Sequence, residues 1–485
     1  MGTLSTILWL PAVTALLVLL LPARSVVAIR ALAMAGSGLA FALAWNLLTS
    51  FDRKSVALQF TERLSWVPEM GMTYALGVDG ISLPMVLLTT LISLLALVAS
   101  GSITERVKQY YGWFLLLETA MLGVFMAQDW FLFYMYYEIA LVPMFFLIGV
   151  WGGKERAAAS MSFFLYTLAG SELMLLGLIA AYLATPGHSF DMQTMARASS
   201  GWSEGFQIAA FMACLIGFAV KVPVFPLHGW LPLAHVEAPV PVSMVLSAVL
   251  LKMGAYGLLR MADLFPVGFE WFTPALFVLG LINIVYGALM AWRQNDLKAM
   301  VAFSSISHMG FVLVGLSALT TAGFSGAMLQ MFTHGLIAAA LFMLVGMIYE
   351  RTHTRQITEF GGLYSQVPRF SLLMTIALLA SMGLPGLAGF VAEFHALVGA
   401  FERWGLVAGI ACVGVLITAA YSLRTISRMF SGPVNPKFGD INDLSAREMA
   451  AAVPLVAMIV ALGLFPGAAL QLMGQAAAPL LAALR

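Results

Sequence analysis

Residues 206–226 read FQIAAFMACLIGFAVKVPVFP, an apolar stretch that closes with one lysine and two prolines. An α-helix needs roughly 20 mostly apolar residues to cross a lipid bilayer, and this stretch has that length. Proline removes a backbone donor and clashes with the preceding turn, so the helix is expected to break after Lys221. Backbone groups freed at membrane depth are tolerated only inside protein or beside a water-filled cavity. The stretch therefore predicts a broken membrane-spanning helix in a wet, protein-lined interior.

The rest of the chain has the composition of a polytopic membrane protein. Of its 485 residues, 61% are hydrophobic and 10% are charged, against roughly 45–50% and about 25% in soluble domains. This excludes a soluble fold and predicts an all-α protein of about fourteen transmembrane helices. The first apolar segment is expected to be a retained span, not a removed signal peptide. The expected spans are 4–22, 31–50, 80–100, 111–128, 130–151, 158–184, 206–224, 241–264, 272–292, 299–318, 324–349, 370–401, 405–430 and 449–472.

A second expected break lies in span twelve, where residues 383–389 read GLPGLAG. The two broken spans are five apart, and a shift by an odd number of spans reverses direction across the bilayer. Spans 4–8 and 9–13 are therefore predicted to be inverted repeats with broken helices at corresponding positions, which is typical of a transport pathway at the bilayer midplane. The predicted regions are 1–110 (three N-terminal spans), 111–264 (first repeat), 265–430 (second repeat) and 431–485 (C-terminal loop and last span).

The distribution of basic residues predicts the orientation in the membrane. When connections are assigned alternately to two sides, fifteen basic residues between Arg24 and Arg447 fall on one side and seven between Arg53 and Arg485 fall on the other. Cytoplasmic connections carry the excess of Lys and Arg. Both termini are therefore expected to lie outside the cytoplasm.

Four charged residues lie deep within apolar spans, namely Glu138, Lys221, Lys252 and Glu393. A charge at the bilayer centre costs at least a few kcal/mol, so such residues usually mark an ion or proton pathway. If Glu138 approaches Lys221, its carboxylate stabilises the ammonium, and when it withdraws the proton leaves more easily. The two residues are therefore predicted to form a switchable pair.

Histidine titrates closest to physiological pH and suits a proton relay. His308 and His334 lie within spans ten and eleven, between the lysines and Glu393 in chain order. They are expected to connect these groups, although a single histidine on an apolar face is more often a structural hydrogen-bonding group. Weaker candidates are Glu172 and His395, together with His228 and His235, which can simply cap or orient the connection after the first break.

Other chemistry is not indicated by the sequence. It has no P-loop, no GxGxxG in a strand-turn-helix setting, no CxxC and no clustered metal-ligand spacing, so we expect no nucleotide, flavin, iron–sulfur cluster or metal on this chain. Its two cysteines, Cys214 and Cys412, are expected to be packing residues. A net charge of +1 gives no reason to expect a nucleic acid partner.

Several motifs resemble the antiporter-like subunits of proton-pumping NADH:quinone oxidoreductase, complex I. The most specific are KVPVFPLHGWLPLAHVEAP at 221–239 and LLKMGAYG at 250–257. Further similarities are LGVDGIS at 76–82, SHMG at 307–310, and GLPG at 383–386 with FVAEF at 390–394, so the resemblance covers nearly the whole chain. Glu393 stands where sibling subunits L and N typically carry lysine, and the chain ends without the lateral helix of subunit L. The chain therefore most resembles subunit M, the counterpart of mitochondrial subunit 4.

The resemblance implies a role for each candidate residue. Glu138 and Lys221 would form the charge-coupled pair, Lys252 the relay in span eight, and His308 and His334 the connecting groups. Glu393 would be the terminal group toward the outside. NADH, FMN, iron–sulfur clusters and quinone would be bound elsewhere in the complex. The expected partners are lipids and other membrane subunits, especially two flanking siblings, in a bacterial inner membrane.

Three positions depart from the pattern of the family, and two alternative functions stay open. Leu233 stands where many relatives have aspartate, Ala392 replaces a common glycine, and His395 is unusual so close to Glu393. One alternative is the D-type member of a multi-subunit sodium/proton antiporter, or the equivalent part of a membrane-bound hydrogenase, because both share the lysine-containing broken span. The other is a stand-alone secondary transporter, which would need a substrate-sized pocket and would be active in isolation.

Overall fold

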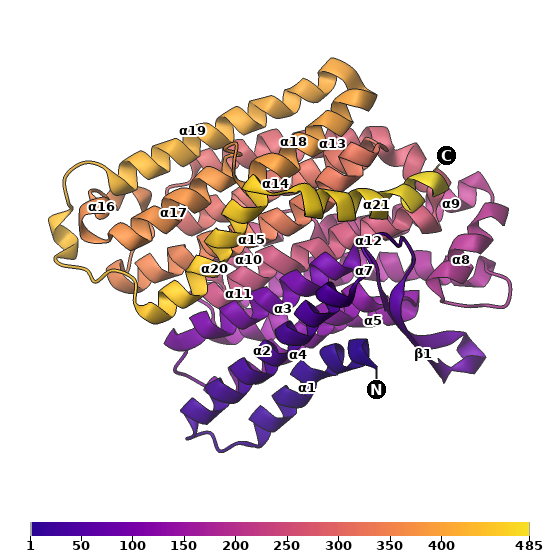
Figure 1. The fold of residues 1–485 in the computed structure, drawn as a ribbon, viewed down its shortest axis with the longest axis horizontal. Coiled ribbons are helices and arrows are strands. Elements are labelled where there is room, and N and C mark those ends of the chain that lie inside the picture. Colours follow the sequence, from indigo (N-terminus) through magenta and orange to yellow (C-terminus); the bar gives the residue numbers. More distant parts are fainter. Residues whose placement is uncertain (1, 485) are drawn as a thin grey trace.

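The computed structural model describes residues 2–484 and is a bundle of long helices with one short hairpin (Figure 1). The elements are α1 (Thr3–Leu20), α2 (Val26–Ser50), β1 (Gln59–Val67), β2 (Met72–Val78), α3 (Ser82–Ala99), α4 (Val107–Met126), α5 (Trp130–Ile139), α6 (Leu141–Trp151), α7 (Arg156–Ala184), α8 (Met192–Ala198), α9 (Glu204–Lys221), α10 (Trp230–Glu237), α11 (Val240–Val245), α12 (Leu251–Leu264), α13 (Pro266–Arg293), α14 (Leu297–Ser317), α15 (Thr321–Thr352), α16 (Leu363–Gln366), α17 (Pro368–Ser381), α18 (Ala388–Trp404), α19 (Ile410–Phe430), α20 (Ala446–Leu464) and α21 (Gly467–Ala483).

The helices account for the predicted spans. Within the described chain, twelve helical stretches are long and apolar enough to cross a membrane. One of these, residues 388–430, contains both α18 and α19, and α4 adds a further helix of 20 residues. A helix of that length measures about 30 Å, which matches the hydrocarbon core of a bilayer. The prediction of an all-α polytopic membrane protein is therefore confirmed.

The connections gather at two ends of the bundle. One end, which we call the hairpin side, carries the antiparallel β1–β2 hairpin and α8, and the Phe190 amide donates to the Gly71 carbonyl to join them. The opposite end, the loop side, carries α16 and the 431–445 connection (Figure 1). Helix α1 begins and α21 ends toward the hairpin side (Figure 1). The end residues Met1 and Arg485, used in the predicted orientation, lie outside the described residues.

Both predicted broken helices are present, and they enter from opposite sides. Helix α9 starts next to α8 and ends at Lys221, whereas α17 starts next to the 431–445 connection and ends at Ser381. Within the first break, a side chain of α13 binds the freed backbone groups. The Phe225 amide donates to Asn283 Oδ1 over 2.8 Å, and Asn283 Nδ2 donates to the Pro223 carbonyl over 3.1 Å. The second repeat thus stabilises the break of the first.

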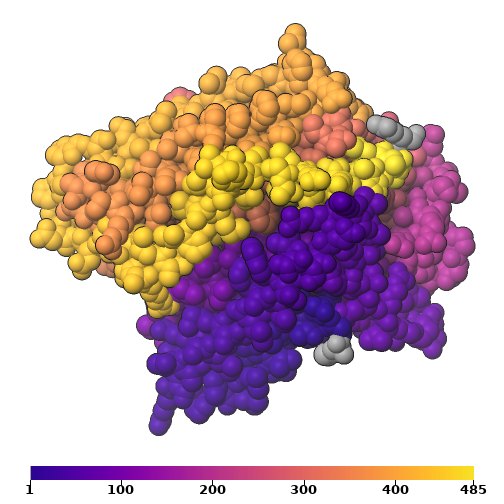
Figure 2. All heavy atoms as spheres, in the orientation of Figure 1, coloured from indigo at the N-terminus to yellow at the C-terminus, as the bar shows by residue number. Residues whose placement is uncertain are grey.

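Two predicted spans are divided in the structure. The span at 130–151 consists of α5 and α6, which meet at Ala140. The span at 449–472 consists of α20 and part of α21, because the chain turns at Phe465 and Pro466. Proline removes a backbone donor and clashes with the preceding turn, which favours a helix end here. Figure 2 shows α21 as a strip between the N-terminal helices and the second repeat. A Cβ on Gly80 would lie 2.9 Å from the Ala476 Cβ, so glycine is needed for this close approach.

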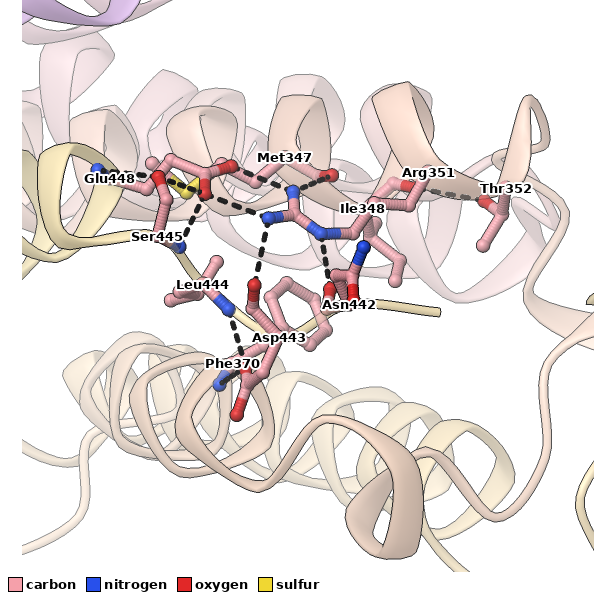
Figure 3. Close-up of polar contacts among 10 residues, drawn as sticks. All are labelled: Met347, Ile348, Arg351, Thr352, Phe370, Asn442, Asp443, Leu444, Ser445 and Glu448. Atoms are coloured by element: carbon pink, nitrogen blue, oxygen red, sulfur yellow. Dashed lines mark hydrogen bonds and ion pairs between the residues drawn. The ribbon is translucent and has the colours of Figure 1, made fainter. Parts of the chain in front are cut away.

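A cluster centred on Arg351 fastens the loop side together (Figure 3). Its guanidinium donates to both carboxylate oxygens of Glu448, each over 2.7 Å, and also to the carbonyls of Asn442 and Asp443. The Asp443 carboxylate accepts from the Arg369 and Phe370 amides at the start of α17. The cluster therefore joins α15, α17 and α20, and with them the first half of the second broken helix.

We expect Arg351→Ala to destabilise the protein by about 1.5–3 kcal/mol, because it removes charge-assisted hydrogen bonds and leaves Glu448 unpaired. The matched control is Lys437→Ala, since the Lys437–Glu359 pair is far more exposed and should contribute little to stability. Thermal unfolding of the protein in detergent would measure both variants. Equal shifts in their midpoints would show that the cluster does not stabilise the loop side.

Candidate functional site

Lys252 lies at the start of α12, directly after a π-helical segment, Leu246–Leu250. A π-helix leaves backbone carbonyls without their usual α-helical partners, and such segments are frequent at functional sites. Lys252 Nζ donates to the Ser247 carbonyl over 2.6 Å, and the side chain is 0% exposed. The irregular turn therefore supplies an acceptor that holds a lysine away from both water and lipid.

The second partner of Lys252 is His334 of α15. Lys252 Nζ lies 2.6 Å from His334 Nδ1, so the ammonium donates to an unprotonated ring nitrogen. The other ring nitrogen, Nε2, is buried without a hydrogen-bond partner in the described chain. His334 can therefore accept a proton at one nitrogen and offer a proton at the other.

His308 of α14 continues the row on the far side of His334. The two rings have centroids 5.3 Å apart. His308 Nδ1 donates to Glu393 Oε1 over 2.8 Å, and its Nε2 lies 3.0 Å from the Ser381 hydroxyl. Gln330 Nε2 also donates to Glu393 Oε1, over 3.3 Å. Each ionisable group in this row is thus paired inside the protein, as groups at membrane depth require.

Four of the six predicted residues therefore form one buried row of Lys252, His334, His308 and Glu393. They come from α12, α15, α14 and α18, and no more than 6% of any of them is exposed. Glu393 lies beside the second break, and a Cβ on Gly383 would be 3.2 Å from its Oε2. Because Gly383 also has φ +78°, a side chain there would both strain the backbone and crowd the carboxylate.

Lys221 and Glu138 are neighbours that do not touch. Lys221 Nζ donates to the Tyr137 carbonyl over 3.3 Å and lies 3.8 Å from the centre of the Tyr137 ring. Glu138 is half-buried, with Oε1 unpartnered, and no ion pair joins it to Lys221 within residues 2–484. The cation is instead stabilised by a carbonyl and by an aromatic face. The predicted charge-coupled pair is therefore separated in this conformation.

The helices that carry the two lysines pack directly against each other. A Cβ on Gly254 would be 3.0 Å from the Lys221 Cβ and 2.9 Å from the Phe218 carbonyl oxygen. Glycine at this position lets α12 pack directly on the end of α9. The helix that carries Lys252 is therefore in direct contact with the broken helix that carries Lys221.

His235 of α10 has a position that the sequence did not indicate. Its side chain is 0% exposed, its ring stacks on Phe342 at 4.5 Å between centroids, and neither ring nitrogen has a hydrogen-bond partner in the described chain. Lys252 and Lys298 are the charged groups near it. A buried ring with two free nitrogens near two lysines is suited to proton transfer, which goes beyond the predicted capping role.

A cavity of about 920 Å³ opens on the loop side next to His235. Its wall includes Val236, Glu237 and Lys298, which lie around the end of α10. Lys298 Nζ donates to the Ala238 and Val236 carbonyls, and Arg355 donates to the Val236 carbonyl as well. The wall of this loop-side cavity thus includes Val236, the residue that directly follows His235 in the chain.

The weaker candidates lie apart from the row. His395 Nδ1 donates to the Val391 carbonyl of its own helix over 2.8 Å, and His228 Nε2 pairs with the Tyr286 hydroxyl over 3.2 Å. Glu172 is exposed on the lateral face of α7, where Glu138 is its neighbour. Sequence reasoning overlooked Gln330, Ser381 and Asn283. Gln330 and Asn283 could have been found, because an amide within an apolar span needs a partner.

Comparisons with known proteins identify the family of this chain. The family model described as NADH:quinone oxidoreductase/Mrp antiporter, TM matches residues 127–418. The model described as NADH-ubiquinone oxidoreductase chain 4, amino terminus matches residues 41–128. The resemblance predicted from the sequence is therefore confirmed over most of the chain.

Whole-chain relatives narrow the assignment. NADH-quinone oxidoreductase subunit M of Rhodobacter capsulatus is 43% identical over 459 residues, covering 92% of this chain and 89% of that protein. NAD(P)H-quinone oxidoreductase chain 4 1 of a Synechococcus species is 43% identical over 482 residues, covering 96% and 90%.

Solved structures agree with these relatives. A chain of respiratory complex I from Thermus thermophilus with bound NADH has a TM-score of 0.90 and 31% identity, with 99% of both chains covered. The Mrp complex of a Dietzia species has a chain with a TM-score of 0.88 but only 21% identity, which shows a shared fold alone. This chain belongs to the family of NADH-quinone oxidoreductase subunit M, which is also named chain 4.

Proposed function

We propose that this chain is a proton-translocating subunit in the membrane arm of respiratory complex I. The observation that carries the proposal is the buried row Lys252–His334–His308–Glu393, which joins groups of both charge signs through hydrogen bonds and ring proximity. Such a row inside a membrane protein is typical of a proton relay. NADH oxidation and quinone reduction, with FMN and iron–sulfur clusters, would take place in other subunits.

Proton uptake would start in the loop-side cavity. A proton from water there reaches His235, whose two ring nitrogens are free in the described chain, and passes to Lys252. The negative charge of Glu138 controls this step from the side. When Glu138 moves toward Lys221, it stabilises that ammonium, and when it withdraws the proton leaves more easily.

A proton can pass from Lys252 to Glu393 mainly through contacts that already exist in the buried row. The Lys252 Nζ–H bond breaks and a His334 Nδ1–H bond forms across the 2.6 Å contact. His334 Nε2 then releases a proton toward His308, and because the ring centroids are 5.3 Å apart, this step needs a bridging water or a ring rotation. His308 Nδ1 passes its proton to Glu393, which ends the relay.

The lateral face of α7 would pack against a flanking sibling subunit. Glu172 is exposed near the middle of that helix, among exposed leucines such as Leu165 and Leu176. Lipid tails cannot solvate a carboxylate, so a neighbour that brings a cation or hydrogen-bond donor fits this face better. Lipids would cover the remaining apolar surface.

The chain would lie in a bacterial inner membrane. The basic residues of the 431–445 connection and its surroundings support a cytoplasmic loop side, and the hairpin side would then face outward.

The first test replaces the charge-coupled pair. Glu138→Gln and Lys221→Ala should each lower the number of protons pumped per electron while the complex still assembles, because a positioned acid or base accelerates proton transfer by about 10²–10⁴-fold. Proton uptake by membrane vesicles and NADH oxidation with an uncoupler would measure the two processes separately. Glu270→Gln, an exposed carboxylate on the hairpin side, is the matched control. Normal pumping in both pair variants, or loss of activity only through failed assembly, would contradict the proposal.

The second test concerns the end of the row. Glu393→Gln should impair pumping, because the amide cannot take up a proton from His308, whereas Glu393→Asp should keep part of the activity. Glu393→Lys tests whether any titratable group suffices, and partial pumping is expected from it. The same vesicle assay applies. Full pumping by the Gln variant would remove Glu393 from the pathway.

The orientation has its own test. Tags at the two ends of the chain should react with a membrane-impermeant reagent added outside the cytoplasm, because both ends are expected on the outer side. A tag next to Lys437 should react only from the cytoplasmic side. A C-terminal tag that reacts only from the cytoplasm would refute the proposed orientation.

A further inference from the structure

The carbonyl end of α10 borders the loop-side cavity. The last carbonyls of an α-helix have no partner within the helix, and they carry its partial negative charge. The His235 carbonyl accepts from the Ser243 hydroxyl over 3.1 Å, and the Glu237 carbonyl accepts from the Gly153 amide over 2.9 Å. The carbonyls on either side of Glu237 lie in the cavity wall and bind side chains of the second repeat instead.

Lys298 of α14 holds these two carbonyls. Its Nζ donates to the Val236 and Ala238 carbonyls, and Arg355 donates to the Val236 carbonyl over 3.0 Å. The Asp296 carboxylate fixes both cations, because it accepts from the Lys298 amide over 2.8 Å and forms an ion pair with Arg355 over 3.0 Å. Only 3% of Lys298 is exposed. Its ammonium is therefore a fixed cation that rests on two carbonyl oxygens at the cavity wall.

These oxygens are also suited to a metal cation. Backbone carbonyls replace the hydration shell of monovalent cations in membrane channels, and carboxylate oxygens bind hard cations. The Glu237 carboxylate belongs to the same cavity wall, and Glu237 and Asp296 are acidic groups near the Lys298 ammonium. Without the ammonium, the carbonyl end of α10 would therefore attract a cation from water on the loop side.

The site lies directly beside the histidine of the proposed inlet. Val236 follows His235 in the chain, and Lys298 is one of the two lysines near the His235 ring. A metal cation held on these carbonyls would exchange with the cavity and would compete with the proton for the entrance. The ammonium cannot leave, because its own side chain tethers it to α14. Its presence therefore decides which cations stand next to His235.

We propose that Lys298 makes the loop-side inlet selective for protons, because its tethered ammonium occupies a carbonyl site that would otherwise bind a monovalent metal cation such as Na⁺. The proton itself reaches His235 along hydrogen bonds and needs no set of oxygen ligands, so the ammonium does not take its place. This inference rests on the proposed function, since it needs the loop-side cavity to be the proton inlet.

The sodium dependence of proton pumping tests this role in the intact complex. In Lys298→Ala, replacing choline chloride by sodium chloride at constant ionic strength should lower pumping several-fold, because Na⁺ binds at the freed carbonyls. The wild type and Lys298→Arg should be insensitive to Na⁺, since a guanidinium also donates to carbonyls. Lys437→Ala, which removes an exposed lysine of the loop side, is the matched control. Equal pumping by an assembled Lys298→Ala complex in both salts, or no pumping in either salt, would overturn the proposal.

Thermal unfolding of the full chain in detergent measures the binding of Na⁺ directly. Lys298→Gln is the milder variant, because its neutral amide can still donate a hydrogen bond at the end of α10. Sodium chloride, compared with choline chloride, should raise the unfolding midpoint of Lys298→Ala and Lys298→Gln but not of the wild type, because a ligand bound by the folded state stabilises it. The same midpoint in both salts for both variants would refute the cation site.

Lys252→Met separates this inference from the proposed function. Normal pumping by Lys252→Met would refute the proposed function as a whole. Lost pumping by Lys252→Met, together with sodium-insensitive pumping by Lys298→Ala, would refute the role of Lys298 alone.

Discussion

The contact between Lys252 Nζ and His334 Nδ1 sets the conditions that the surrounding helices have to meet. A lysine that is 0% exposed within a membrane-spanning bundle is tolerable only if the protein replaces its hydration shell. The Ser247 carbonyl and His334 do so over 2.6 Å each. Because the distance between Lys252 Nζ and His334 Nδ1 must be kept short, the π-helical segment before α12 has to pack on α15 and turn its Ser247 carbonyl inward.

Helix breaks place the other charged groups around that contact. Lys221 lies at the end of α9 and Glu393 follows the gap between α17 and α18, so each break supplies a charged side chain near the middle of the bundle. The freed backbone groups of the first break bind Asn283, which belongs to the opposite repeat. The second repeat therefore stabilises irregular backbone in the first.

Two cavities lie at opposite ends of a closed centre. The loop-side cavity of about 920 Å³ ends near His235, and a cavity of about 250 Å³ on the hairpin side, which α21 helps to enclose, ends at Asp263. Lys252 is buried between them, with His334 and His308 leading sideways toward Glu393. This arrangement separates water on the two sides. A protein that moves protons must avoid a continuous water path, and a buried lysine that is bonded inside the protein meets that requirement.

Local sequence patterns were sufficient to predict the membrane fold, the two breaks and the identity of the charged candidates. Hydropathy, proline and intramembrane charge act locally, and the bilayer imposes the same helical solution on each apolar run. Which of the candidate residues contact one another depends on the packing of helices that are distant in sequence. Lys252 and His334 are 82 residues apart and His308 and Glu393 are 85 apart, so their contacts require helix packing and side-chain rotamers that no local pattern encodes. For the same reason the separation of Glu138 from Lys221, the free ring of His235 and the cavity under α21 could not be predicted, because each depends on how distant helices fit together.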